Sequence, residues 1–272
     1  MRASRMEHGN EDSEGLVRRR PVDSAPVGMT ELPALEQVLR EIVAEGGADA
    51  PRRICEACMA ALPLDRAALA LMTAPDQQER LWASDEVARK LDDLQFSLGE
   101  GPCVEAFVDR RPVLVADLTE HAHSRWPVFA AAALRTPVRA LFVLPVQAGG
   151  ITVGVLDLYR DTPGMLDPDE LAGALRAADA AMWTLLGLRD GETGYAGVDG
   201  VSRADGNGRQ PVSELHRLEV YQATGMIVEQ MQVSPEVALS ALRAHAFAQG
   251  QTILQVAHEV DVRGLRFDEE KP

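Results

Sequence analysis

The chain has 272 residues, and its 46% hydrophobic content is enough to bury the core of one large domain or two ordinary ones. It carries 27 basic against 42 acidic residues, and the formal net charge of −15 opposes nonspecific attraction to nucleic acid and anionic membranes. Any nucleic-acid partner would therefore have to be met by a local basic patch.

The three cysteines stand at positions 55, 58 and 103, an odd number without the spacing of a disulfide framework, so we expect reduced thiols. No apolar run reaches 18 residues, and the first 26 residues lack the hydrophobic stretch of a signal peptide. We therefore expect a cytoplasmic protein with no membrane contact.

Residues 1–29 are polar, charged and interrupted by Pro21 and Pro26, which predicts a disordered tail. Apolar residues at spacings of three and four then predict an amphipathic helix over 31–45 that ends near Gly46 and Gly47. A second helix is expected over 50–62.

Alternating and β-branched residues predict strands over 65–73 and 79–84, followed by a short helix near 85–95. A loop over 98–103, a helix over 103–110, a strand over 112–118 and a helical segment over 125–136 come next. Segments 138–147 and 151–161 flank Gly149 and Gly150, which is typical of a β-hairpin. With a long helix over 168–188, this order predicts an α+β domain over 30–188, an antiparallel sheet with flanking helices.

Residues 189–212 contain six glycines and are expected to form a flexible linker between domains. The remainder, 213–267, is expected to be a small all-α domain of three helices. In the first helix one stripe is expected to hold Leu215, Leu218, Tyr221, Gly225, Val228 and Met231. The second is expected to begin at Ser234 and Pro235 and to bury Ala238, Ala241, Leu242 and Ala246. The third is expected to begin with a capping box from Thr252 to Gln255 and to present Ile253, Val256, Ala257 and Val260.

The pieces "QATGM", "ALSALRAHA" and "LQVAHEV" within 213–267 resemble the ANTAR domain, an RNA-binding three-helix module of bacterial transcription antiterminators. Upstream, "LGEGPCVEAF", "RWPVF" and "GVLDLYRDTPGML" resemble a GAF sensory domain of the kind that precedes ANTAR in actinobacterial proteins. The resemblance implies a signal-responsive regulator that binds hairpins of nascent RNA and promotes antitermination. No nucleophile, base and orienting acid are jointly suggested, so we expect no enzyme activity.

The resemblance implies RNA contact through a small-residue patch on the first helix and an arginine on the second. We predict the RNA-binding residues to be Arg217, Gln222, Ala223, Thr224, Gly225 and Arg243. Thr224 departs from the family, which has a basic residue there, because a threonine can donate a hydrogen bond to phosphate but cannot neutralise it. Segment 213–267 holds four arginines against six acids, a net of −2, so RNA affinity is expected to be weak or to need a dimer.

Several of these residues have a second interpretation. Gly225 could serve a close crossing of two helices instead of a close approach of RNA. Arg243 could be an ordinary solvated arginine paired with an acid, and His245, Met226 and Met231 are typical packing residues.

The cysteines also have two readings. Cys55 and Cys58, with Cys103, His121 and His123, could form a zinc site, although a second matched pair is missing and we predict no metal. Cys103 begins a helix, where a thiolate could be stabilised for redox sensing.

Two other functions stay open. A DNA-binding helix-turn-helix regulator would need basic and amide groups on its recognition helix, where "ILQVAHEVDVRG" has acids. A sensor or protein-interaction module that has lost RNA binding would explain Thr224. A small-molecule ligand of the GAF-like domain is a further expected partner, but neither it nor a cofactor is identified. The apolar faces of helices 31–45 and 168–188 predict a homodimer.

Overall fold

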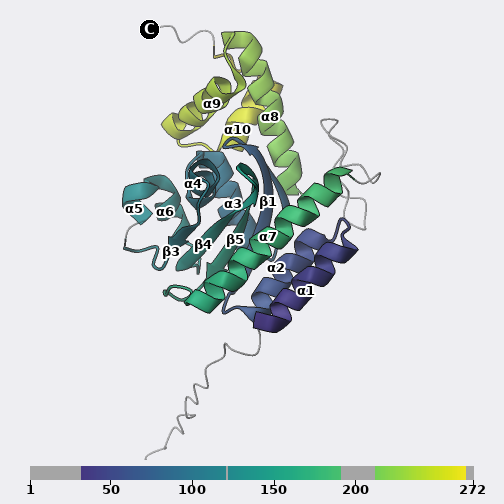
Figure 1. Ribbon diagram of the computed structural model, residues 1–272. Helices are drawn as coiled ribbons and strands as arrows, with labels where there is room; N and C mark the ends of the chain where they lie inside the picture. The colour runs from purple at the N-terminus through teal and green to yellow at the C-terminus, as the bar shows by residue number, and fades with distance from the viewer. Residues whose placement is uncertain (1–31, 121, 191–211, 268–272) are drawn as a thin grey trace, which may run out of the picture.

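The structure is a computed structural model that describes residues 32–120, 122–190 and 212–267 (Figure 1). The predicted tail over 1–29 and nearly all of the predicted linker lie outside these residues. No helix among the described residues has both the length and the apolar character needed to cross a membrane.

The centre of the fold is an antiparallel sheet of five strands in the order β2-β1-β5-β4-β3. The strands are β1 (Arg66–Ala74), β2 (Gln77–Ala83), β3 (Val113–Val115), β4 (Ala140–Ala148) and β5 (Ile151–Arg160). The predicted hairpin is confirmed, because β4 and β5 pair up to Ala148 and Ile151, and Gly149 takes the positive φ of 62° that its turn requires. The predicted antiparallel α+β sheet is confirmed with it.

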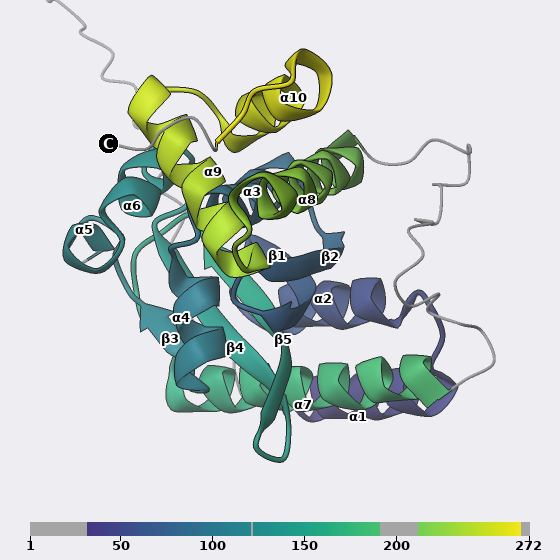
Figure 2. The same ribbon diagram turned by 90° about the horizontal axis from the view of Figure 1, so that it is seen from above.

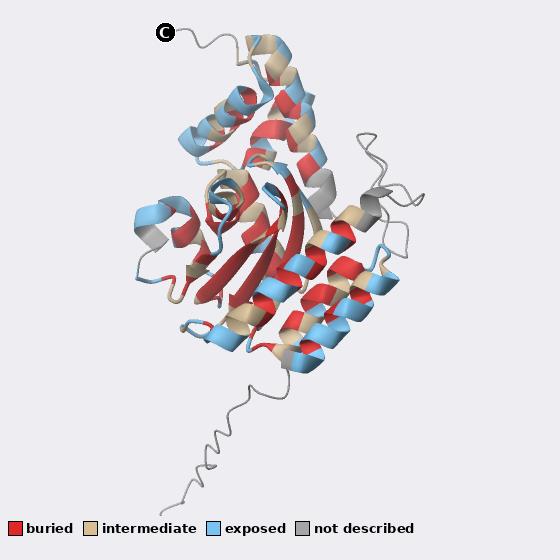
Figure 3. Ribbon diagram, in the orientation of Figure 1, coloured by how far each residue is buried: buried red, intermediate tan, exposed pale blue. Residues whose placement is uncertain are grey.

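Three helices cover one face of the sheet: α1 (Leu32–Glu45), α2 (Ala50–Ala61) and α7 (Pro168–Asp190) (Figures 1 and 2). Their apolar sides close over strand residues such as Phe142 and Leu156, so β1, β4 and β5 are buried along most of their length (Figure 3). The alternation of β5 sends Leu156 and Leu158 to this face and Val155, Asp157 and Tyr159 to the other.

The opposite face is covered by α3 (Glu86–Leu98), α4 (Pro102–Asp109) and α6 (Pro127–Ala133), and α5 (Ala122–Arg125) lies beside α6. Of the helix predicted over 125–136 only α6 is present, and it is preceded by α5, which the sequence pattern does not predict. Pro127 restricts the residue before it to extended backbone, and Trp126 accordingly has φ −137° and ψ 75° between α5 and α6. The strand predicted over 112–118 is also shorter than expected, with only three residues in the ladder.

The C-terminal unit consists of α8 (Val212–Met231), α9 (Pro235–Gln249) and α10 (Ile253–Arg263), as the three-helix pattern predicts. The capping box at Thr252 is present with both of its hydrogen bonds. Ser234 stands at the N-cap of α9, but its side chain makes no capping bond. The predicted core positions of α10 are all buried, and so are those of α9 apart from Ala241, which is half-buried.

The stripe predicted for α8 is confirmed for Tyr221, Val228 and Met231, which pack against the core of the C-terminal helices, and is wrong for Leu218 and Gly225. Leu218 is 41% exposed and Gly225 is exposed, whereas Arg217, Val220 and Ile227 are buried. The prediction placed the apolar Leu218 inside. The polar Arg217 faces inward instead, because it pairs with the buried carboxylate of Asp92 on α3.

Candidate functional site

The C-terminal unit meets the sheet domain, residues 32–190, where α8 and α9 lie against α3 and the start of β2 (Figures 1 and 2). Among the described side chains of the C-terminal unit, Arg217, Tyr221 and Arg243 reach across. One side chain reaches the other way, since Phe96 of α3 is 4% exposed and belongs to the core of α8, α9 and α10.

Arg217 enters a cluster of four charges. Its Nη2 donates to Asp92 Oδ2 and, at 3.4 Å, to Asp93 Oδ1, and its Nη1 donates to the carbonyl of Gln78 at 3.0 Å. Arg80 Nη1 donates to the same two carboxylates at 2.8 and 2.9 Å. Burial disfavours the charged guanidinium of Arg217, but Asp92 and Asp93 outweigh it and raise its pKa above the ordinary value.

Aromatic contacts surround this cluster. The Tyr221 hydroxyl accepts from the Gln78 backbone N–H at 3.2 Å and donates to its carbonyl at 3.3 Å. The rings of Tyr221 and Phe96 meet edge to face with centroids 5.6 Å apart, and the Arg217 guanidinium lies 5.0 Å from the Phe96 centroid. Phe96 is thus enclosed by side chains of α8.

Arg243 of α9 lies against the end of α3. Its Nη2 donates to the Phe96 carbonyl at 2.6 Å, and its guanidinium lies over Gly99, the residue that caps α3 in the left-handed conformation. Burial without a bonded carboxylate lowers the pKa of Arg243. The reading of Arg243 as a solvated arginine paired with an acid is therefore wrong.

The predicted RNA-binding residues fall into two groups. Arg217, Ala223 and Thr224 are buried and Arg243 is half-buried, all on the side that faces the sheet domain or the unit's own core. Thr224 Oγ1 donates to the Val220 carbonyl at 2.7 Å, so its hydroxyl is already used. Gln222 and Gly225 are exposed, and Gln222 Nε2 donates to Asp261 at 2.8 Å.

Gly225 has no packing reason to be a glycine. A Cβ built there would meet no heavy atom within 4 Å. A close helix crossing would leave backbone or side-chain atoms in that space, so the interpretation of Gly225 as a crossing point is wrong. Met226, Met231 and His245 do pack as expected; the ring of His245 lies 5.2 Å from that of Phe267.

A second polar cluster lies inside the sheet domain, between β5, α3 and α4. Cys103 Sγ donates to Asp157 Oδ1 at 2.8 Å, and the Cys103 backbone N–H donates to Gln95 Oε1 at 2.8 Å. All three residues are at most 1% exposed. Asp157 Oδ2 and the Tyr159 hydroxyl are buried and have no hydrogen-bond partner among the described residues.

Burial sets the protonation of this cluster. It raises the pKa of Asp157 to about 7, and burial together with the neighbouring Asp157 raises the pKa of the Cys103 thiol well above its usual range. A stabilised thiolate at the start of α4 is therefore excluded as the resting form. Burial also raises the pKa of Cys58 to about 12.

The zinc interpretation gains no support. Among the described residues no group of three or more His, Cys, Asp or Glu side chains could hold a metal ion. The side chains of His121 and His123 lie outside the described part of the chain.

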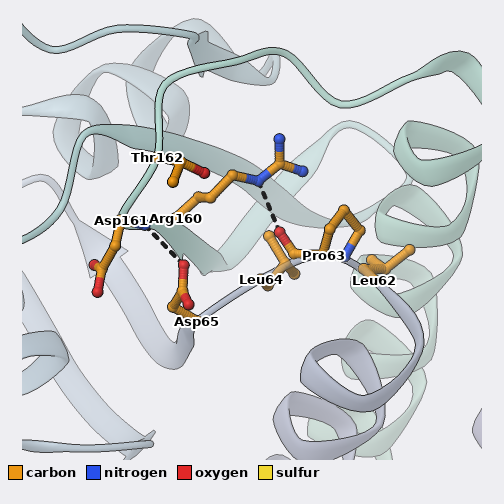
Figure 4. A pocket seen from close by; sticks show the side chains of 7 residues that line it. All are labelled: Leu62, Pro63, Leu64, Asp65, Arg160, Asp161 and Thr162. Carbon is orange, nitrogen blue, oxygen red and sulfur yellow. Dashed lines mark hydrogen bonds between the residues drawn. The ribbon is translucent and has the colours of Figure 1, made fainter. Parts of the chain in front are cut away.

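Two shallow surface hollows are present in the described structure, and neither opens onto the buried polar cluster. The first, of about 400 Å³, is lined by Leu62, Pro63, Leu64, Asp65, Arg160, Asp161 and Thr162 (Figure 4). Its polar groups bind one another: Arg160 Nε donates to the Pro63 carbonyl, and Asp161 N donates to Asp65 (Figure 4). The second lies on α8 and α10, where His258 pairs with Glu219 and Arg263 with Glu259.

The family profile of the GAF domain matches residues 50–182, which span the sheet from β1 to β5 and most of its helices. The chain contains a GAF domain. With α1 and the end of α7 added, residues 32–190 are called the GAF domain. No curated protein matches the chain significantly.

Solved structures similar to the chain cover its GAF domain. The GAF domain of a phosphoenolpyruvate-protein phosphotransferase from Coxiella burnetii is 17% identical, with a TM-score of 0.47 over 58% of this chain and 96% of that one. Its counterpart from Acinetobacter is 13% identical, with a TM-score of 0.48 over 58% and 94%. A free methionine-R-sulfoxide reductase from Neisseria meningitidis is 17% identical, with a TM-score of 0.42 over 58% and 87%.

Sequence reasoning named Arg217, Arg243 and Cys103 for other roles. It missed their partners Asp92, Phe96 and Asp157. Asp157 carries a readable signal, since it is a single acid in the apolar run "ITVGVLDLYR", where an acid must either reach water or be held inside. Asp92 and Phe96 carry none, because a short amphipathic helix with exposed acids and one aromatic residue is typical of many surfaces.

Proposed function

We propose that the protein is a cytoplasmic, signal-responsive regulator in which the GAF domain controls an ANTAR-like unit, residues 213–267, that binds hairpins of nascent RNA and promotes antitermination. The proposal depends on Gly225. A glycine inside a helix costs about 1 kcal/mol relative to alanine, and the open space around Gly225 removes the packing explanation. A bare stretch of helix backbone that a bulky ligand can approach closely explains its presence.

Recognition of this kind requires no catalytic chemistry. Proteins read RNA hairpins through splayed loop bases and the shape of the phosphate backbone. Gln222, one turn before Gly225 and exposed, offers an amide for base edges. Arg217 and Arg243 would supply positive charge for phosphates when their present partners release them.

The test is a binding assay with the full chain, a two-hairpin RNA and a DNA duplex of matched length, each at two salt concentrations. We expect the RNA to bind more tightly than the duplex. Gly225→Leu fills the bare backbone and should weaken RNA binding at least tenfold without lowering the melting temperature. Ala131→Leu, which places the same leucine side chain at an exposed helical alanine of the GAF domain, is the matched control and should bind as wild type does.

A second candidate is a sensor or protein-interaction module that has lost RNA binding. The hydrogen bond from Thr224 to Val220 favours it, since this hydroxyl has no free donor for a phosphate. Absence of RNA binding at low salt, in wild type and in Gly225→Ala alike, would support this candidate and overturn the RNA-binding function. Tighter binding of the duplex would instead indicate a DNA-binding regulator.

A further inference from the structure

The contact between α3 and the C-terminal unit withholds the groups that RNA would need. Arg217 is 7% exposed, with its guanidinium held by Asp92 inside the GAF domain, and Arg243 is bound to the Phe96 carbonyl. Only Gln222 and Gly225 of the predicted surface face solvent in this arrangement. Because phosphate binding depends on neutralising charge, this docked form is poorly suited to RNA.

We propose that this docked arrangement is a closed form that weakens RNA binding, and that α3 is the helix whose displacement opens it. The inference rests on the RNA-binding function proposed above and assigns its regulation. Phe96, the charge cluster of Arg80, Asp92, Asp93 and Arg217, and the Arg243 contact together form what we call the clamp.

The charge cluster can divide without leaving a buried charge alone. When Arg217 withdraws, Arg80 still bonds Asp92 at 2.8 Å and Asp93 at 2.9 Å, and Gln78 Nε2 still donates to Asp92. Removing one member of a buried ion pair is expensive mainly when its partner stays buried and unpaired. Asp92 keeps its other partners and Arg217 moves into water. Separation therefore leaves no buried charge unpaired, and the contact can open and close reversibly.

Phe96 makes α3 the element that controls the contact. Its ring belongs to the core of the C-terminal helices and not to the core of the GAF domain. The preceding residue, Gln95, points the other way and accepts the hydrogen bond of the Cys103 backbone beside Asp157. Adjacent residues of α3 therefore contact the buried polar cluster and the clamp. A movement of α3 that changes the contacts of the buried polar cluster also changes those of the clamp.

Gly99 offers a way to perturb the clamp from the GAF side. A Cβ at Gly99 would lie 2.7 Å from Arg243 Nη1 and 2.8 Å from Arg243 Cζ, so Gly99→Ala must displace the Arg243 side chain. Gly250, which caps α9, has the same φ of 65° but no heavy atom within 4 Å of its Cβ position. Gly250→Ala thus carries the same backbone strain without the collision.

The experiment compares full-length wild type, Phe96→Ala, Gly99→Ala and the control Gly250→Ala. The backbone N–H of Gln78 donates a hydrogen bond to the Tyr221 hydroxyl, so its hydrogen-exchange rate reports opening of the contact. The radius of gyration reports separation of the units. Affinity for the two-hairpin RNA is measured in parallel. We expect Phe96→Ala and Gly99→Ala to exchange faster and to bind RNA about fivefold more tightly, the effect of removing one net hydrogen bond or more from the closed form. Gly250→Ala should match wild type in both readouts.

The outcomes separate the two proposals. Opening without any RNA binding, in wild type and variants, keeps the clamp and overturns the RNA-binding function. Opening with unchanged RNA affinity, where wild type binds RNA, overturns the clamp as a control device. Unchanged exchange in both Phe96→Ala and Gly99→Ala, with melting curves showing folded proteins, overturns the closed form itself.

Discussion

At the scale of single residues, Asp157 is an ionisable group whose folded environment opposes its charge. Burial raises its pKa from about 4 in an unfolded chain to about 7. Between these pH values the unfolded chain has lost a proton that the folded chain keeps, so the folded state loses stability as pH rises from about 4 to 7 and no further above that.

This linkage predicts a difference between wild type and Asp157→Asn, which cannot ionise. Urea unfolding at pH 4.5, 6 and 8 should show the stability of wild type relative to the variant falling by roughly 2 to 4 kcal/mol across the series. A difference that stays constant with pH would show that Asp157 is already ionised in the folded protein.

Gly225 and Arg217 show how far sequence reasoning reaches at this scale. The unusual glycine was visible in the sequence as a residue that needs a reason, but only the empty space around it decides between a helix crossing and a bare surface. The burial of Arg217 could not be predicted, because it depends on a second unit that meets α8 from a distant part of the chain.

At the scale of elements, periodicity predicted most helices and strands because their apolar faces repeat at 3.6 or 2 residues. It failed on α8, where an arginine takes an inward position that an apolar residue usually fills. It also missed α5, a single turn too short to show a periodic apolar face.

The central strand pair supplies a sharp element-scale prediction. A Cβ at Gly154 of β5 would lie 2.3 Å from the Ala70 carbonyl of β1, so Gly154→Ala must push these strands apart. We expect it to lower the free energy of unfolding by about 3 kcal/mol. Gly150→Ala, at the nearby turn with no neighbour within 4 Å, should change it by less than about 0.5 kcal/mol. Chemical denaturation of both variants checks this, and equal stabilities would contradict it.

At the scale of the whole molecule, the predicted homodimer stays a proposal. The apolar faces of α1 and α7 that suggested it are largely used within the chain, where Leu39, Ile42 and Ala181 are buried in the core. Trp183 remains 59% exposed and Leu175 41% exposed on α7, eight residues apart and so on similar sides of that helix.

We therefore expect light scattering at micromolar concentration to report a dimer, and Trp183→Ser to shift it toward monomer. Ile151→Ser removes a residue that is 68% exposed at the tip of the β4–β5 hairpin and should leave the dimer intact. A wild-type monomer under these conditions would contradict the prediction.

The seating of Phe96 in the core of the neighbouring unit has a practical consequence for anyone who cuts the chain in two. A GAF fragment purified without residues 212–267 would expose the phenyl ring on α3 to solvent. Exposed apolar patches promote aggregation. Aggregation of such a fragment would thus reflect the loss of the C-terminal helices that cover this ring and not a misfolded sheet.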